Sequence, residues 1–167
     1  MPEGQDLENW LAAQHRNSEK ENVTQGTPFL AVLRNEHGLA VPLEQVRLIA
    51  RLESFSPLPG APPLLPGATS LQGRIVALID LGPLLEEDPL QPHIGMYVTV
   101  VSDGDVEAGL LVTRALDMHL VPEEYIQKED ITPYIVGRYA WPLSEPQKAF
   151  DIIHVANILE AARHVFR

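Results

Sequence analysis

The side chains that could perform acid–base or metal chemistry are six histidines and 23 acidic residues. The histidines are His15, His37, His93, His119, His154 and His164. No two of them are two, three or four residues apart, so the sequence contains no local histidine motif for a metal ion. His119 with Asp117, or His154 with Asp151, could still converge from strands as a general base beside a carboxylate. A small β-barrel enzyme with such a His/Asp site is therefore one alternative.

Common catalytic and ligand-binding motifs are absent from the sequence. There is no G-x-G-x-x-G, G-x-x-x-x-G-K-[ST], G-x-S-x-G or H-E-x-x-H, and without cysteine there is no thiolate nucleophile. Residues 103–105, DGD, match only the start of a calcium loop and are more typical of a hairpin tip. The acidic residues 86–88, 123–124 and 129–130 are expected to be exposed. We therefore expect a chain that is not an enzyme and that binds no metal or cofactor.

The overall charge disfavours two classes of partner. The formal charge of −11 and the pI of about 4.8 repel phosphate backbones and anionic lipids. No apolar run approaches the ~18 residues of a membrane span. The first ten residues lack the basic and apolar regions of a secretory signal. Together with the absence of cysteine, this pattern predicts a cytoplasmic protein that binds neither nucleic acid nor membrane.

Alternating apolar and polar residues predict a fold built mostly of strands. Residues 29–34 and 39–43 flank a hairpin loop, with Gly38 placed for a positive φ. The next strand, residues 45–54, directs Val46, Leu48 and Ala50 to one side. A loop with five prolines follows, and the apolar run of residues 73–81 then predicts a strand buried on both sides.

Later segments continue the same pattern. Residues 96–102 and 106–113 are predicted to pair around DGD, residues 116–122 form another strand, and residues 134–143 pair with 148–155. Nine or ten short strands with tight turns favour an all-β barrel or sandwich over a nucleotide-binding βαβ sheet.

Helices are predicted near the two ends, and a short one is predicted just before the acidic residues 86–88. Ile158, Leu159, Ala162 and Val165 have the spacing of one helical face in the C-terminal segment. Residues 1–26 form a polar extension in which Leu7, Trp10 and Leu11 predict a short amphipathic helix. That helix either packs on the domain or binds a partner.

Residues 58–81, LPGAPPLLPGATSLQGRIVALIDL, resemble the signature of CheW-like domains. That family pattern is a proline-bearing loop, a glycine, an NLRG turn and a strand of the type xIVPVIDL. Here the glycine is Gly67, the turn is SLQG at residues 70–73, and the strand is residues 74–81. FLAVLRNEHGLAVPLEQV resembles the family's first hairpin, YVTVVSDGDVEAGLLVTRAL its later hairpin, and residues 134–159 its closing pair and terminal helix. The ordered matches cover about residues 27–167.

The resemblance implies two small SH3-like five-stranded β-barrels packed together within residues 27–167. It also implies a non-catalytic adaptor that links the cytoplasmic tips of methyl-accepting chemoreceptors to the regulatory domain of a CheA-type histidine kinase. Adaptor and kinase domain would associate barrel end to barrel end, and the receptor tip would bind a groove between the barrels.

The same resemblance assigns candidate partner-binding and structural residues. The partner-binding candidates are Leu48, Ser70, Leu71, Gln72, Gly73, Arg74 and Thr113. Gly67 and Gly73 are expected to turn the backbone, and Asp80 to cap the step into the segment LGPLL.

Several of these positions depart from the family pattern. Gln72 and Ser70 replace the arginine and asparagine of NLRG, Leu48 replaces a glutamate, Thr113 an aspartate, and His154 a late aspartate. An amide cannot reproduce the bidentate bonds of a guanidinium, so Gln72 bears most on partner recognition. Arg74, two residues further on, either offers its charge beside Gln72 or is a solubilising strand residue.

These departures favour a divergent branch of the family. Type IV pili and twitching motility, or another non-flagellar output, are the outputs we expect for such a branch. A regulatory decoy that binds only one of the two partners is a further alternative.

Overall fold

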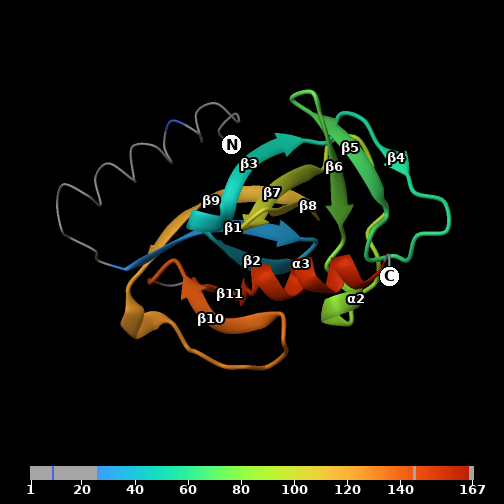
Figure 1. Ribbon diagram of the computed structural model, residues 1–167. Coiled ribbons are helices and arrows are strands. Elements are labelled where there is room, and N and C mark those ends of the chain that lie inside the picture. The colour runs from blue at the N-terminus through green and yellow to red at the C-terminus, as the bar shows by residue number, and fades with distance from the viewer. Residues whose placement is uncertain (1–8, 10–25, 145, 166–167) are drawn as a thin grey trace.

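The computed structural model describes residue 9 and residues 26–144 and 146–165, about half of them in strands (Figure 1). The strands are β1 (Thr27–Arg34), β2 (His37–Pro42), β3 (Val46–Arg51), β4 (Ser56–Pro57), β5 (Gly67–Leu71), β6 (Arg74–Ile79), β7 (Tyr97–Asp103), β8 (Val106–Val112), β9 (Arg114–Val121), β10 (Ile135–Trp141) and β11 (Lys148–Ile153). The helices are α2 (Gly82–Leu85) and α3 (Val155–His164), with 3-10 turns η1 (Leu43–Gln45) and η2 (Glu123–Tyr125). The amphipathic helix predicted around Leu7, Trp10 and Leu11 lies outside the described residues.

The strands form two sheets. One has five strands in the order β10-β11-β2-β1-β9, and the other has six in the order β3-β7-β8-β6-β5-β4. The prediction of a mostly β fold with two barrel-like units is confirmed, although neither barrel is closed in the part of the chain that the structure describes. The proline-rich loop contributes the two-residue strand β4 as a sixth member, and among the described residues no pairing joins the outer strands of either sheet. Both sheets are therefore curved but open.

Three hairpins are closed by two-residue turns, although the sequence predicted a four-residue loop, residues 35–38, for the first of them. Arg34 pairs with His37, Leu71 with Arg74, and Asp103 with Val106. Each turn contains a residue with positive φ: Asn35 at 55°, Gln72 at 50° with Gly73 at 78°, and Gly104 at 62°. Such turns match the right-handed twist of the strands they join.

Gly38 has a different role from the predicted one. The positive φ of the first hairpin falls on Asn35, and Gly38 lies in β2. A Cβ on Gly38 would lie 2.6 Å from the carbonyl oxygen of Ala149 and 2.8 Å from the Phe150 ring. Glycine is required there because β11 approaches closely, not because the chain turns.

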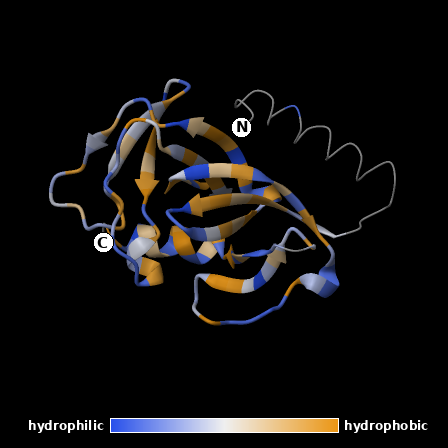
Figure 2. Cartoon of the chain, turned by 180° about the vertical axis from the view of Figure 1, so that it is seen from behind, coloured by the Kyte–Doolittle hydropathy of each residue, from blue (hydrophilic) through white to orange (hydrophobic). Residues whose placement is uncertain are grey.

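The core consists of three clusters in layers. A central cluster lies between the sheets and includes Leu30 and Val32 of β1, Leu110 of β8 and residues of α3. The six-stranded sheet has its own cluster around Leu78 and Val98, and the five-stranded sheet has an aromatic cluster around Tyr139. Figure 2 shows the hydrophobic stretches along the strands that supply these clusters. Strands near the junction are buried on both faces, which accounts for their nearly continuous apolar sequences.

Two strands depart from the predicted burial pattern. The β3–β7 register shifts between Val46 and Leu48, so Val46 and Ile49 are buried while Leu48 and Ala50 are half-buried. In β6, Ile75 and Ala77 are exposed although Ile79 on the same face enters the central cluster. The strand extends beyond the junction, because β8 pairs with β6 only at Leu78 and Ile79.

The C-terminal helix α3 ties the two sheets together. Val155, Ile158 and Leu159 are buried in the central cluster, and the helix packs against β7 and β8 of the six-stranded sheet (Figure 1). His154 is the N-cap residue: its Nδ1 accepts a hydrogen bond from the backbone N–H of Asn157 at 3.1 Å. The prediction of a strand-borne His154 beside Asp151 is therefore wrong, because its ring serves the helix start.

No helix in the described part of the chain has both the length and the apolar composition needed to cross a bilayer.

Candidate protein interaction surface

The β5–β6 hairpin presents most of the predicted partner-binding residues at one edge of the six-stranded sheet. Its arms pair from Gly67 with Leu78 to Leu71 with Arg74, and Gln72 and Gly73 form the turn. Both turn residues have positive φ, which is the geometry of a type I′ turn. The hairpin tip is thus held in one shape by its turn geometry and by the pairing of β5 with β6.

Exposed side chains cover the hairpin. Ser70, Gln72, Gly73 and Arg74 are exposed, and Ile75, opposite Ser70, is 84% exposed. An isoleucine exposed to this extent is an apolar contact point that the sequence had assigned to the core. A polar tip beside an uncovered isoleucine is a composition suited to a protein partner.

One interpretation of the sequence placed Arg74 on the same strand face as Gln72, but the structure does not. Gln72 lies in the turn, so the two-residue periodicity of a strand does not extend across it. Arg74 instead pairs with Glu107 of β8, with Nη2 and Oε1 3.0 Å apart and 59% of the arginine side chain exposed.

Leu48 and Leu71 pack against the same hydrophobic cluster. Both are half-buried and pack against the six-stranded sheet's cluster, although one lies on β3 and the other on β5. Each leaves part of its apolar surface in solvent. The two leucines are therefore anchored in the core and can still offer apolar surface to a partner.

Thr113 belongs to a different region from the hairpin. It links β8 to β9, and its hydroxyl donates to the carbonyl oxygen of Leu33 at 2.8 Å. The hydroxyl oxygen of Thr113 in turn accepts a hydrogen bond from the backbone N–H of Asn35 at 2.9 Å. Thr113 thereby holds the β1–β2 turn, and the structure does not bring it together with Gln72.

Gly67 lies in extended β5 and does not turn the backbone. A Cβ at this position would overlap the Phe55 ring and the carbonyl oxygen of Ser56. The glycine allows the short strand β4 and the Phe55 ring to lie against β5. Only Gly73 of the two predicted turn glycines has positive φ.

Asp80 lies in the junction between the sheets and is 0% exposed. Its Oδ1 accepts the N–H of Gly82 at 3.0 Å, at the start of α2, and its Oδ2 accepts that of Leu90 at 2.7 Å. Arg34, at the end of β1, donates from Nε to the same Oδ1 at 2.9 Å. The carboxylate therefore orders the α2 segment and holds a buried guanidinium.

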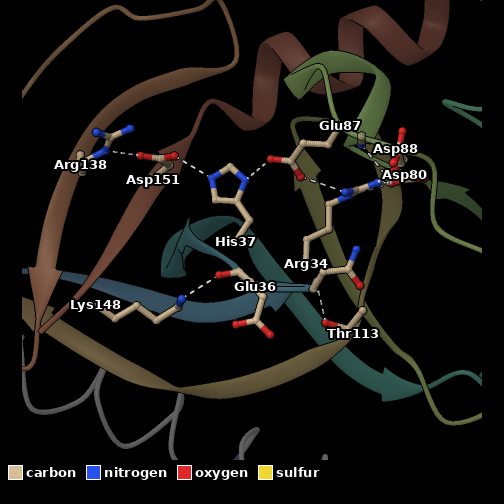
Figure 3. Close-up of polar contacts among 12 residues, drawn as sticks. Arg34, Glu36, His37, Asp80, Glu87, Asp88, Thr113, Arg138, Lys148 and Asp151 are labelled. Carbon is tan, nitrogen blue, oxygen red and sulfur yellow. Dashed lines mark hydrogen bonds and ion pairs between the residues drawn. The ribbon is translucent and has the colours of Figure 1, made fainter.

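Arg34 and Asp80 belong to a chain of polar contacts that we call the junction cluster: Arg34, His37, Asp80, Glu87, Asp151 and Arg138 (Figure 3). Arg34 Nη1 lies 2.9 Å from Glu87 Oε1. His37 lies between two carboxylates, with Nδ1 2.5 Å from Glu87 Oε2 and Nε2 2.7 Å from Asp151 Oδ2. Figure 3 shows the imidazole ring pointing a nitrogen at each carboxylate. The cluster joins the two sheets through charged side chains.

Asp151 is held in its charged form by this cluster. Burial alone would raise its pKa, but hydrogen bonds from Arg138 and His37 outweigh burial and leave the pKa below the usual value for aspartate. Arg138 donates from Nε to Oδ1 at 2.6 Å. The carboxylate is therefore ionised at neutral pH.

The junction cluster was missed in the sequence. Glu87 was expected to be exposed, yet only 30% of its side chain is exposed because Arg34 and His37 both contact it. One local signal was present: Arg34 ends an otherwise apolar strand, and a buried arginine requires an acidic partner.

His119 is packed among aromatic rings rather than paired with a carboxylate. Its Nδ1 lies 2.9 Å from the Tyr139 hydroxyl, and its ring stacks on Trp141 with centroids 4.4 Å apart. Burial lowers the pKa of His119 to about 4, partly opposed by the charge of Asp117, and burial raises the pKa of Tyr139. Asp117 itself accepts the backbone N–H of Met118. The His119–Asp117 pair that the enzyme alternative requires is therefore not formed.

Across the described residues, no group of three or more histidine, aspartate and glutamate side chains is arranged to hold a metal ion.

Comparison with known proteins agrees with this architecture. The scaffolding protein TtCheW from Thermoanaerobacter tengcongensis has a similar structure, with a TM-score of 0.65 over 77% of this chain and 89% of that chain, at 17% sequence identity. At that identity the likeness shows the fold alone. No curated protein matches the sequence. A family model described as CheW-like domain matches residues 28–163. Since this match spans most of the sequence, the chain belongs to the CheW-like domain family.

Proposed function

We propose that this chain is a non-catalytic adaptor of a chemosensory pathway. It links the cytoplasmic tips of methyl-accepting chemoreceptors to the regulatory domain of a CheA-type histidine kinase. Family membership and the likeness to a scaffolding protein support this proposal. The observation that carries it is Ile75, 84% exposed beside the rigid tip of the β5–β6 hairpin.

The partner-binding surface we propose consists of the hairpin residues Ser70, Leu71, Gln72, Gly73 and Arg74, together with Ile75 and Leu48. Leu48 and Leu71 are half-buried on the same cluster, so they supply apolar contact area at little conformational cost. An interface of standard size buries roughly 1,600 Å² in total, and a micromolar affinity corresponds to about −8 kcal/mol. Thr113 lies elsewhere, so any partner contact that it makes is separate from the hairpin.

The cellular context remains part of the proposal. We assign the chain to the cytoplasm, with residues 27–167 as the folded unit and residues 1–26 as its extension. The replacement of the family's NLRG arginine by Gln72 supports a divergent branch, such as one that serves type IV pili and twitching motility.

Direct titration tests the adaptor function. The full chain is titrated against the cognate kinase regulatory domain and against a receptor-tip fragment. We expect binding without turnover, and Ile75→Ser should weaken it between tenfold and a hundredfold, because a buried isoleucine contributes about 1.5–3 kcal/mol. Leu120→Ser, at a leucine 46% exposed on β9, is the matched control and should bind like the wild type. Absence of binding to both partners would overturn the proposal.

A decoy that keeps only one partner is a second candidate, favoured by the exposed amide of Gln72 in place of a guanidinium. Gln72→Arg should then restore the weaker of the two interactions, since arginine forms bidentate bonds to a carboxylate. An affinity unchanged by this substitution would count against the decoy.

A further inference from the structure

His37 occupies an unusual position because its two ring nitrogens face carboxylates from different parts of the fold. Glu87 follows α2, which is continuous with β6 of the six-stranded sheet, and Asp151 lies in β11 of the five-stranded sheet. The Nδ1–Glu87 and Nε2–Asp151 distances are 2.5 and 2.7 Å. His37 is thus a bridge between the two halves of the protein.

The protonation state of the ring decides whether both contacts are favourable. A neutral imidazole has one N–H donor and one lone pair, whereas an imidazolium has two donors. An ionised carboxylate is only an acceptor, so a neutral ring would turn its lone pair toward one of the two oxygens. Only the doubly protonated ring donates to both carboxylates at once.

The charges around His37 agree with this assignment. Arg34 on β1 neutralises one side of the junction cluster and Arg138 on β10 the other, while Asp80, Glu87 and Asp151 supply three negative charges. The cluster is neutral when His37 carries a proton and has a charge of −1 when it does not. The other charged groups nearby are Glu36, Lys148, Glu86 and Asp88; Lys148 bonds the Glu36 carbonyl, and Glu86 and Asp88 line cavities beside His37.

We propose that protonated His37 is a pH-sensitive latch that holds the α2 segment against β11. Loss of the proton leaves Glu87 and Asp151 facing a nitrogen lone pair and each other's charge, so α2 loosens. A cavity of about 560 Å³ adjoins the latch, lined by His37 and Asp151 and by Leu84 of α2 and Tyr134 across from it. Loosening α2 therefore alters the width of this cavity and the way the two sheets are joined. The latch is a property of the folded chain and does not depend on the adaptor function.

Hydrogen exchange of the α2 amides tests the latch. Leu84, Leu85 and Glu87 donate backbone hydrogen bonds within this segment, so their exchange reports its opening. In the full-length wild type, we expect protection, corrected for intrinsic exchange, to be roughly tenfold greater at about pH 5.5 than at about pH 8. His93→Gln is the matched control, because His93 is exposed and, among the described residues, its side chain has a hydrogen bond only with the carbonyl oxygen of its neighbour Ile94. This control should keep the wild-type response.

Two variants distinguish the latch from a general effect of pH. His37→Gln should lose the pH response of the α2 amides. Glu87→Gln should give higher protection than the wild type at about pH 8, because its amide can donate to a neutral Nδ1 while its oxygen still accepts from Arg34. In the wild type, ¹⁵N spectra of the ring at acidic pH should show protons on both nitrogens. Equal wild-type protection at both pH values, or a pH response that survives in His37→Gln, would overturn the proposal.

Discussion

Arg34 Nη2 and Asp80 Oδ1 lie 2.8 Å apart, with 1% of each side chain exposed. Arg34 ends a strand of the five-stranded sheet, and Asp80 follows a strand of the six-stranded sheet, so this ion pair crosses the junction. Gly82 makes room for it, since a Cβ there would overlap the guanidinium. A buried ion pair contributes little to the net free energy of unfolding, but removing only one of its two residues leaves the other charge buried without a partner and is strongly destabilising.

Arg34→Met should therefore lower the free energy of unfolding by about 3–5 kcal/mol, because it leaves the Asp80 carboxylate buried and unpaired. Urea unfolding of the wild type and variant measures the difference. Arg74→Met is the control, since its pair with Glu107 is largely exposed and should contribute much less. The double variant Arg34→Met with Asp80→Leu should recover part of the loss. Equal effects at Arg34 and Arg74 would contradict this account.

Thr99→Val should stabilise the protein. Thr99 is 0% exposed in β7, and its Oγ1 has no hydrogen-bond partner among the described residues. Valine keeps the shape and removes an unsatisfied hydroxyl, so we expect a gain of about 1 kcal/mol in the free energy of unfolding. Thr69→Val should have the opposite sign, because Thr69 Oγ1 donates to the Ser54 carbonyl oxygen at 2.7 Å. Thermal unfolding of both variants checks the pair, and a destabilised Thr99→Val would contradict the assignment.

Gly67→Ala should weaken the edge of the six-stranded sheet. The added methyl group would meet the Phe55 ring and the Ser56 carbonyl oxygen, and overpacking of this kind costs about 1–3 kcal/mol. Hydrogen exchange should reveal the loss in β4 and β5, while β10 and β11 in the other sheet keep their protection. Uniform weakening of both sheets would show that the effect is not local.

The stability of the protein should fall as the pH decreases from 6.5 to about 4 because of His119. Burial lowers the pKa of His119 in the folded chain to about 4 from its ordinary 6.5, so in this range the unfolded chain binds a proton that the folded chain does not. The resulting decrease in the free energy of unfolding is up to about 3 kcal/mol. Asp151, whose pKa lies below the usual aspartate value, contributes at more acidic pH.

His119→Phe isolates this effect, since phenylalanine keeps an aromatic ring beside Trp141 and cannot titrate. Unfolding free energies measured at several pH values from 4 to 7 should be flatter for the variant than for the wild type. Parallel curves would indicate that another group is responsible.

The parts of the fold that sequence could predict are those set by neighbouring residues. Gly73 and Gly104 mark two-residue turns, and the apolar spacing of Ile158 and Leu159 marks the helix that follows His154. The order of these elements was enough to identify the family resemblance.

The junction cluster could not be predicted because its members are far apart in the chain. His37 is 50 residues from Glu87 and 114 from Asp151. The pairing of β11 with β2 brings Asp151 close to His37, whereas Glu87 follows α2 after a strand of the other sheet. The exposure of Ile75 could not be predicted from the sequence either. Its sequence neighbours are apolar, and its exposure depends on how far β8 extends along β6. Both features arise from tertiary pairing, not from local pattern.

The six-stranded sheet is formed by one continuous stretch, β3 to β8, whereas the five-stranded sheet combines β1 and β2 with β9 to β11. During synthesis, β1 and β2 of the five-stranded sheet therefore cannot pair with β9 and β11 until these later strands have been made. The entropy lost in closing so long a loop falls on the β1–β9 pairing, while the inserted unit assembles from nearby segments. We accordingly expect the β5–β6 hairpin to form on the nascent protein before Asp151 has been synthesised and can contact His37.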